Sequence, residues 1–285
     1  MASASRCARI MERMTDSSTG AGPRSVHAER VMGTVVSFDL RGPGDHDGAI
    51  GSAVAWFHDV DRRFSTYRDD SEVSRLSRGE PIGPPSSDLR EVLAACDAVT
   101  AASGGAFAAT RSGRFDPSAY VKGWSVQRAA RILREHGCER WSMNAGGDVL
   151  VSSGPSSADP WRIGVQHPFD PTALATVLHA RDLAVATSGR YERGDHIEDP
   201  RTGAVATAAA SVTVCGPDLG LADAYATAAF VLGEAGPAWV SGLAGYECWS
   251  VLHDGRVIAT RGFPLLVEGV PVSTGRVDDL LQVVA

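Results

Sequence analysis

The chain has 285 residues, of which 44% are hydrophobic and 21% charged, and its formal net charge is −7. This apolar content is enough to bury a core, so a wholly disordered chain is excluded. No apolar run reaches the roughly 18 residues of a membrane-spanning helix. The acidic balance argues against a nucleic-acid-binding protein, although a local cluster could still hold a small anion.

Residues 1–30 are polar and contain no apolar stretch of signal-peptide length. We therefore expect a flexible tail over residues 1–30, followed by a single domain over residues 31–285. The five cysteines are odd in number and scattered, without the close spacing of a zinc site or redox motif. A reducing compartment fits this pattern, and the cytoplasm is the expected location.

Apolar periodicity and turn residues predict the elements from residue 31 onward. In chain order they are a strand at 32–40, a helix at 48–64, a polar loop at 64–79, a helix from Ser86 or Ser87 to Gly104-Gly105, a helix from Ser118 to His136, a hairpin at 140–154, a strand at 161–168, two strands within 173–189, a strand at 211–216, a helix at 221–236 and a hairpin at 248–263. Strands and helices do not alternate strictly. The order therefore favours an α+β fold with mixed or antiparallel sheets and packed helices.

The first candidate for chemistry is the pair Asp223 and Thr227 on the predicted helix at 221–236. Residues four apart lie on one helix face, so the carboxylate and the hydroxyl point the same way. Two neighbouring oxygen ligands suit Mg²⁺. Taken alone, the same spacing is also that of an ordinary surface pair.

The second candidate is the sequence FDPSAYVKGW at residues 115–124. Asp116 or Ser118 can cap the start of the following helix, and a helix start attracts anions. Lys122 comes one turn later and is the single lysine among 27 basic residues. Its ammonium could reach a phosphate at the helix end, where a guanidinium would not substitute for it. An ordinary capped helix with an exposed lysine is the alternative.

Two glycine-containing turns and one histidine complete the candidates. Asn144-Ala-Gly-Gly-Asp148 and Thr187-Ser188-Gly189 are either tight turns or loops that present N–H groups to a phosphate or flavin edge. His196 precedes a turn sequence and is either structural or a proton acceptor. The sequence contains no Gly-rich dinucleotide fingerprint, no Walker-type loop and no Gly-x-Ser-x-Gly elbow.

Over roughly residues 31–263, these pieces resemble the FAD:protein FMN transferase family, also called ApbE. The resemblance is carried by Met32-Gly-Thr34, Phe64-Ser-Thr-Tyr67, Ser71-Glu-Val-Ser-Arg-Leu76, Gly104-Gly-Ala-Phe107, Asp116-Pro-Ser-Ala-Tyr-Val-Lys-Gly123, Asn144-Ala-Gly-Gly-Asp148, Thr187-Ser-Gly-Arg-Tyr191, His196-Ile-Glu-Asp-Pro-Arg-Thr-Gly203 and Ala222-Asp-Ala-Tyr-Ala-Thr227. It implies an ApbE-like, T-fold-like α+β architecture. It also implies transfer of FMN from FAD to a Thr or Ser hydroxyl of a target flavoprotein, with release of AMP.

The resemblance also implies roles for individual residues. FAD contacts fall on Met32, Tyr67, Ala106, Phe107, Ala108, Asp116, Lys122 and Ile197. The metal, Mg²⁺ with Mn²⁺ as the alternative, falls on Asp223, Thr227 and the Ala119 carbonyl. His196 matches the histidine suspected as the general base, and Lys122 adds positive charge at the phosphates.

The sequence departs from the family pattern mainly before the Lys-Gly motif. Ala108 stands where many relatives have Asp, and a long insertion is reduced to Ala109–Phe115. Glu198 replaces an isoleucine. Two other functions stay open. A Mg²⁺-dependent FAD pyrophosphatase, with water as acceptor, needs the same contacts to metal and phosphate. An FAD-binding protein without turnover stays open because Ala108 lacks the acidic side chain.

Overall fold

The computed structural model describes residues 22–111, 113–155, 159–189, 197–263 and 281–284. Nine strands form one sheet in the order β1-β2-β5-β6-β9-β10-β11-β12-β13. All neighbours are antiparallel except β12 and β13, which are parallel. The strands of this sheet are β1 (Arg24–Val31), β2 (Thr34–Arg41), β5 (Arg140–Ala145), β6 (Asp148–Ser152), β9 (Asp182–Gly189), β10 (Ala209–Gly216), β11 (Glu247–Leu252), β12 (Val257–Thr260) and β13 (Leu281–Val284).

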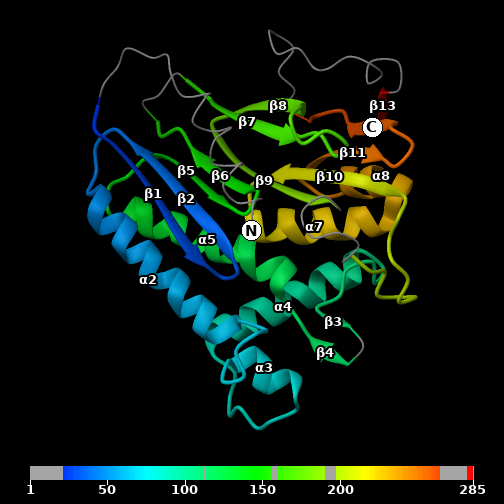
Figure 1. The fold of residues 1–285 in the computed structure, drawn as a ribbon, viewed down its shortest axis with the longest axis horizontal. Coiled ribbons are helices and arrows are strands. Elements are labelled where there is room, and N and C mark those ends of the chain that lie inside the picture. The colour runs from blue at the N-terminus through cyan, green and yellow to red at the C-terminus, as the bar shows by residue number, and fades with distance from the viewer. Residues whose placement is uncertain (1–21, 112, 156–158, 190–196, 264–280, 285) are drawn as a thin grey trace.

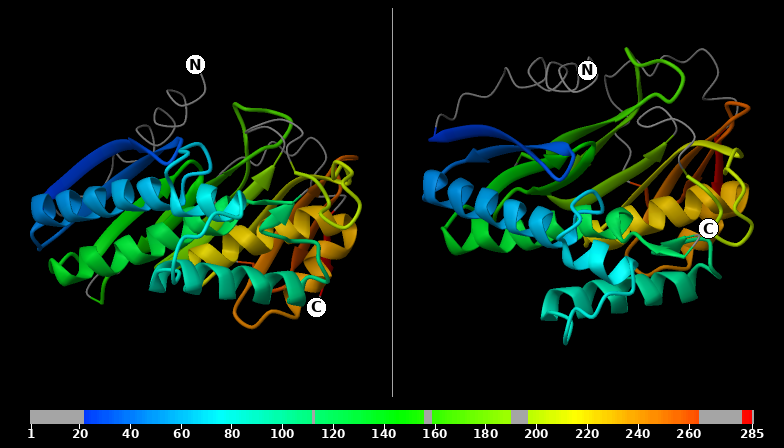
Figure 2. Two further views of the ribbon diagram at one scale, coloured as in Figure 1. Left: turned by 90° about the horizontal axis from the view of Figure 1, so that it is seen from below. Right: turned by 60° about the horizontal axis from the view of Figure 1, so that its bottom comes forward.

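Helices cover one face of this sheet, and a two-stranded hairpin packs on the other (Figures 1 and 2). The helices are α2 (His46–Phe64), α3 (Glu72–Ser77), α4 (Ser87–Ala102), α5 (Ser118–Glu135), α7 (Leu219–Leu232) and α8 (Gly236–Ser241), with a 3-10 turn at Gly233–Ala235. The hairpin is β7 (Trp161–Gln166) with β8 (Leu174–Ala180), and a short ribbon pairs β3 (Thr110–Arg111) with β4 (Arg114–Phe115). Helices α3 and α4 and the ribbon lie at the lower edge of the view in Figure 1.

Alternation along the strands divides the buried side chains between the two faces. On β10, Val212 and Val214 join the core beneath the helices, whereas Cys215 joins the core beneath the β7–β8 hairpin. All eight residues of β10 are buried, because both faces of this central strand are covered. The sheet is therefore the middle of three layers.

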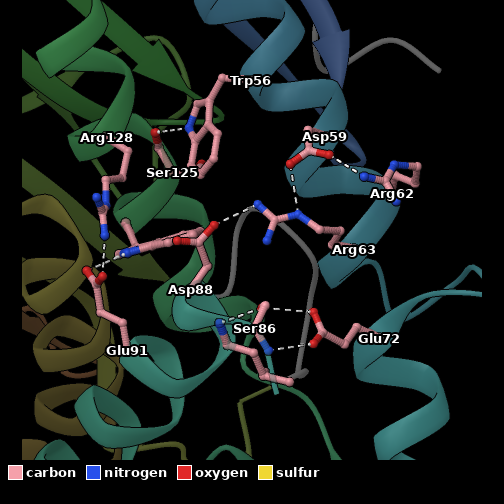
Figure 3. A network of polar contacts seen from close by, with 12 residues as sticks. Trp56, Asp59, Arg62, Arg63, Glu72, Ser86, Asp88, Glu91, Ser125 and Arg128 are labelled. Carbon is pink, nitrogen blue, oxygen red and sulfur yellow. Dashed lines mark hydrogen bonds and ion pairs between the residues drawn. The ribbon is translucent and has the colours of Figure 1, made fainter. Parts of the chain in front are cut away.

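A network of polar contacts joins helices α2, α3 and α4 (Figure 3). The Arg63 guanidinium of α2 donates to Asp59 and to Asp88 of α4, each over 2.8 Å. The Glu72 carboxylate of α3 accepts from the backbone N–H and the hydroxyl of Ser86, each over 3.1 Å. Ser86 is also the N-cap of α4. This network fixes α4, and with it the segment that leads from α4 to α5.

Most predicted elements are confirmed, including the α+β class. Helix α4 begins after its Ser86 cap, α5 spans Ser118–Glu135 with Gly137 in the left-handed region, and the hairpin turns at Gly146-Gly147. Local signals sufficed in these cases, because a cap or a glycine turn marks each boundary.

Two predictions were wrong in their boundaries. Residues 24–30, expected in the tail, belong to strand β1, which pairs with β2 along its whole length. This edge strand is only half-buried on alternate residues, so its sequence carries a weak apolar signal. Residues 72–77, expected in a loop, form α3 behind a Ser71 cap. Residues 1–21 lie outside the described part of the chain.

Candidate active site

Helices α5 and α7 cross in close contact, and this crossing sets the geometry of the site. A Cβ on Gly123 of α5 would lie 2.3 Å from the Leu219 carbonyl oxygen of α7, so only glycine permits the approach. One turn further along α5, the side-chain oxygen of Gln127 accepts from the Leu219 N–H over 3.2 Å. The helices run in opposite directions, which brings Lys122 beside Asp223.

Lys122 lies between two buried carboxylates. Its Nζ is 2.7 Å from Oδ2 of Asp148 and 3.8 Å from Oδ2 of Asp223. The exposed fractions of the side chains are 22% for Lys122, 1% for Asp148 and 7% for Asp223. Buried carboxylates are costly unless cations or hydrogen bonds compensate them. The two carboxylates therefore offer oxygen atoms to the Lys122 ammonium and to a further cation.

Asp148 is held by the sheet itself. It is the first residue of β6 and follows the Gly146-Gly147 turn, both residues of which have positive φ. Its Oδ1 accepts from the Thr187 N–H of the neighbouring strand β9 over 3.3 Å, while its Oδ2 faces Lys122. The carboxylate thus links two strands to the helix layer.

Thr227 and Ser188 extend the cluster with hydroxyl oxygens. Thr227 lies one helical turn after Asp223 and donates its hydroxyl proton to the Asp223 carbonyl oxygen over 3.2 Å. The Ser188 hydroxyl of β9 is 3.3 Å from the Thr227 hydroxyl. When the Thr227 proton points back into the helix, Ser188 is the donor between the two hydroxyls, and one lone pair of the Thr227 oxygen remains for a cation.

The N-cap of α5 is Pro117, which makes no side-chain cap bond, so neither Asp116 nor Ser118 is the N-cap. Asp116, the residue before it, nevertheless binds the first backbone N–H of the helix, as predicted. Oδ1 of Asp116 accepts from the Ser118 backbone N–H over 3.0 Å and from the Ser118 hydroxyl over 2.5 Å. The Asp116 N–H in turn donates to the Ala109 carbonyl over 2.6 Å. Asp116 therefore fixes the first turn of α5, which carries Ala119, and places it one turn before Lys122.

Met32 lies in the two-residue turn between β1 and β2. Its φ of 53° makes it the one non-glycine with positive φ among the described residues, and Gly33 follows at 70°. The Ser125 hydroxyl of α5 contacts the Met32 sulfur at 3.6 Å and bonds the Lys122 carbonyl at 2.7 Å. This strained turn is thus held over α5, next to Lys122.

The remaining predicted residues do not belong to the Lys122–Asp148–Asp223 cluster, and their surroundings differ from one another. Tyr67 is 91% exposed in the turn between α2 and α3. Ala106 and Phe107 are buried in the core between α4, α5 and α7, so only their backbone could touch a ligand. Ala108 lines a hollow of about 190 Å³ between α4 and the β3–β4 ribbon.

The segment after β9 carries the last two predicted residues. Ile197 is buried in the main core, and its carbonyl accepts from the Ala206 N–H over 2.9 Å. His196 lies outside the described residues.

Sequence reasoning missed the contacts of Asp148 and Ser188. Both occur in the two glycine-containing segments named above, of which only the backbone N–H groups were considered. The first segment holds a turn at Gly146-Gly147, but residues 187–189 form the end of strand β9 and no turn, because they pair with β10. A signal was present: an acidic residue opens the otherwise apolar segment DVLV, at a position whose neighbours two apart are buried. A carboxylate there requires a buried cation as partner.

The architecture defines an α+β protein with oxygen ligands and one ammonium gathered where two helices meet the sheet. The chain belongs to the ApbE family, whose model matches residues 32–114 and 109–249. The two matched segments overlap at residues 109–114, within the shortened stretch before α5.

Two relatives from bacteria carry the name FAD:protein FMN transferase. The Rhodobacter capsulatus protein is 30% identical over 240 residues, which cover 81% of this chain and 43% of that protein. The Vibrio cholerae protein is 33% identical over 129 residues, covering 42% and 39%. The chain therefore spans less than half the length of these two relatives.

Solved structures show the same fold. The flavin transferase ApbE from Vibrio cholerae superposes with a TM-score of 0.75 at 23% identity, covering 86% of this chain and all of that one. The ApbE protein of Thermotoga maritima gives a TM-score of 0.73 at 22% identity, covering 82% and 96%. Among the described residues, no helix combines the length and apolarity needed to cross a membrane.

Proposed function

We propose that the chain is a Mg²⁺-dependent flavin transferase that moves FMN from FAD to a Thr or Ser hydroxyl of a target flavoprotein. The acceptor oxygen forms a bond to the phosphorus of the FMN half. The bond from that phosphorus to the bridging oxygen breaks, and AMP leaves with the bridging oxygen. The observation that carries the proposal is the buried Lys122–Asp148–Asp223 cluster in a chain whose relatives are named FAD:protein FMN transferases.

The residues present fit a Mg²⁺ ion. Asp223 and Thr227 offer a carboxylate and a hydroxyl one helical turn apart, and the Ala119 carbonyl belongs to the adjacent first turn of α5. Among the described residues, no group of three or more His, Cys, Asp or Glu side chains could hold a metal. The site therefore depends on neutral oxygens, the donor set of an ion that keeps water and phosphate ligands. Mn²⁺ has similar requirements and is the alternative metal.

The bound ion supplies charge neutralisation at the diphosphate. Lys122 adds a point charge on the same side, from a position that Asp148 and the α5–α7 crossing define. We assign His196 as the base that removes the acceptor proton. Phosphoryl transfer needs mainly positioning and charge neutralisation, so this set of groups is chemically sufficient.

The FAD contacts that the resemblance to the family implies are kept here as proposals. We assign them to Met32, Tyr67, the backbone of residues 106–108, Asp116 and Ile197. Met32 has the strongest support, because its turn is held against α5 beside Lys122. The acceptor is a separate flavoprotein or domain, and we propose the cytoplasm as the place of reaction.

The test is a mass spectrum of an FMN-accepting flavoprotein domain after incubation with the chain, FAD and Mg²⁺. The proposal predicts the added mass of a covalently bound FMN on a Thr or Ser. Asp223→Asn should slow the transfer by about 10²–10³-fold, the cost of one transition-state contact. Asp47→Asn, an exposed carboxylate on α2, is the matched control.

The two alternative functions give different results in the same assay. Free FMN and AMP without a modified acceptor would indicate a pyrophosphatase. Bound FAD that remains intact with every acceptor and metal would indicate a binding protein. Either result overturns the transferase proposal.

A further inference from the structure

We propose that Asp148 is a positioning residue that holds the Lys122 ammonium away from Asp223, so that Asp223 can bind the metal ion. The inference rests on the proposed function, because it concerns the same cluster. It assigns a specific task to a carboxylate that the metal and phosphate contacts do not require.

The ammonium lies closer to Asp148 than to Asp223. Lys122 Nζ and Asp148 Oδ2 form a close ion pair at 2.7 Å. The Lys122–Asp223 distance of 3.8 Å is beyond hydrogen-bond range and leaves an electrostatic contact only. Of the two carboxylates, Asp148 therefore attracts the ammonium more strongly, because the attraction falls with distance.

Asp148 is well placed to hold the ammonium because it is itself fixed. Its second oxygen accepts from the Thr187 N–H over 3.3 Å, and the Gly146-Gly147 turn precedes it. A Cβ on Gly146 would lie 2.4 Å from the Thr34 hydroxyl oxygen, so this turn packs tightly on β2. Its position is thus set by the sheet and not by the flexible lysine.

Lysine has a long, flexible stem and would move if this partner were lost. Asp223, already 3.8 Å away, is the other carboxylate of the described cluster and could receive it. Closer approach strengthens the attraction between opposite charges, most strongly in a buried site. The ammonium would then compete with the metal ion for Asp223.

The test is a double-mutant cycle on metal binding by the chain without FAD or acceptor. Mn²⁺ is the probe, and its affinity is measured by electron paramagnetic resonance with and without ADP. Asp148→Asn keeps the shape of the side chain and should weaken Mn²⁺ binding by about tenfold, which corresponds to about 1.4 kcal/mol. In a Lys122→Met background, Asp148→Asn should change the affinity by less than about twofold, because no competing ammonium remains.

The cycle separates this role from the alternatives. If Asp148 were a metal ligand, or acted through its charge alone, Asp148→Asn would weaken binding equally in both backgrounds. That result would overturn the proposal, as would an Asp148→Asn protein with wild-type affinity or a wild-type protein that does not bind Mn²⁺ under either condition. Thermal denaturation of each variant shows whether it is folded.

A second measurement uses the fact that Lys122 is the only lysine. In protein labelled with ¹⁵N at the lysine Nζ, a single ammonium signal reports on its partner. We expect the signal to persist at a new shift in Asp148→Asn, because Asp223 takes over. It should disappear into fast exchange with water only when Asp223→Asn is added. Loss of the signal in Asp148→Asn alone would contradict the proposal.

Both measurements omit the flavin and the acceptor. A chain that shows the predicted coupling but transfers no FMN would retain the role of Asp148 and lose only the proposed function. A chain that transfers FMN without the coupling would lose only the role of Asp148.

Discussion

Gly123 of α5 faces the Leu219 carbonyl of α7 so closely that a Cβ on Gly123 would lie 2.3 Å from that oxygen. The next residue toward the N-terminus is Lys122, and Asp223 lies one turn beyond Leu219. The helix crossing therefore brings the backbone of Lys122 close to that of Asp223, while the ion pair with Asp148 helps to place the ammonium itself.

Gly123→Ala should destabilise the protein by about 1–3 kcal/mol, the usual cost of overpacking. It should also reduce FMN transfer, because the helices must separate at the site. The matched control is Gly51→Ala, since Gly51 lies in helix α2 with open space around its Cα. There the same substitution should stabilise by about 0.5–1 kcal/mol, because alanine is the better helix former. Urea denaturation measures both, and equal effects would contradict the account.

Lys122→Arg should not preserve activity, although the charge is kept. A planar guanidinium is larger than an ammonium and does not fit the space between Asp148 and Asp223 as a point charge. We expect FMN transfer to fall about 10²–10³-fold. The control is the reverse exchange, Arg62→Lys, at an exposed side chain of α2. Activity within a factor of two of wild type in Lys122→Arg would refute the positional role of the ammonium.

Thr227→Val removes one hydroxyl while nearly keeping the side-chain shape. If Thr227 is a metal ligand, the concentration of Mg²⁺ needed for half-maximal activity should rise by about 10- to 100-fold. Thr227→Ser should restore most of the metal dependence. Ser188→Ala should have a smaller effect, because Ser188 contacts Thr227 at 3.3 Å. Titration of activity with Mg²⁺ compares the three, and an unchanged requirement in Thr227→Val removes Thr227 from the site.

We expect the free energy of unfolding to depend on pH through the carboxyl of Asp39 on β2, which does not belong to the candidate active site. Burial raises the pKa of its carboxyl, but hydrogen bonds from Arg41 and Arg24 outweigh burial and hold the pKa below its usual value. A group with a lowered folded-state pKa stabilises above its unfolded pKa and loses this contribution as pH falls through the folded pKa.

Asp39→Asn should therefore cost about 2 kcal/mol at pH 7, the size of hydrogen bonds to charged groups. The difference from wild type should shrink as pH falls below about 4, the ordinary pKa of Asp. Melting temperatures measured between pH 7 and pH 3 test this. A constant difference over the whole range would show that the ion pairs contribute nothing.

Much of the fold could be predicted because local signals mark it. The Ser86 cap, Gly137 after α5 and the Gly146-Gly147 turn each determine a boundary from a few neighbouring residues. Strand β1 was missed because an edge strand buries only one side in part. The six-residue helix α3 was missed although Ser71 caps it, because a helix this short also depends on contacts such as that of Glu72 with Ser86, which sequence does not reveal.

The site was predictable in part for the same reason. Asp223 and Thr227 are one turn apart on one helix, so periodicity alone places them together. Lys122 and Asp148 meet only after α5 packs on the sheet, and nothing local to either residue specifies the other. The sequence marked both segments, but the ion pair between them required the structure.

The most direct measurement is a crystal structure of the chain with FAD and Mn²⁺, with the metal located by its anomalous scattering. The account predicts a manganese ion within about 2–2.5 Å of oxygens of Asp223 and Thr227. It also predicts the Lys122 ammonium within hydrogen-bond distance of a phosphate oxygen of the same FAD. A diphosphate bound elsewhere, with no metal peak at these oxygens, would contradict it.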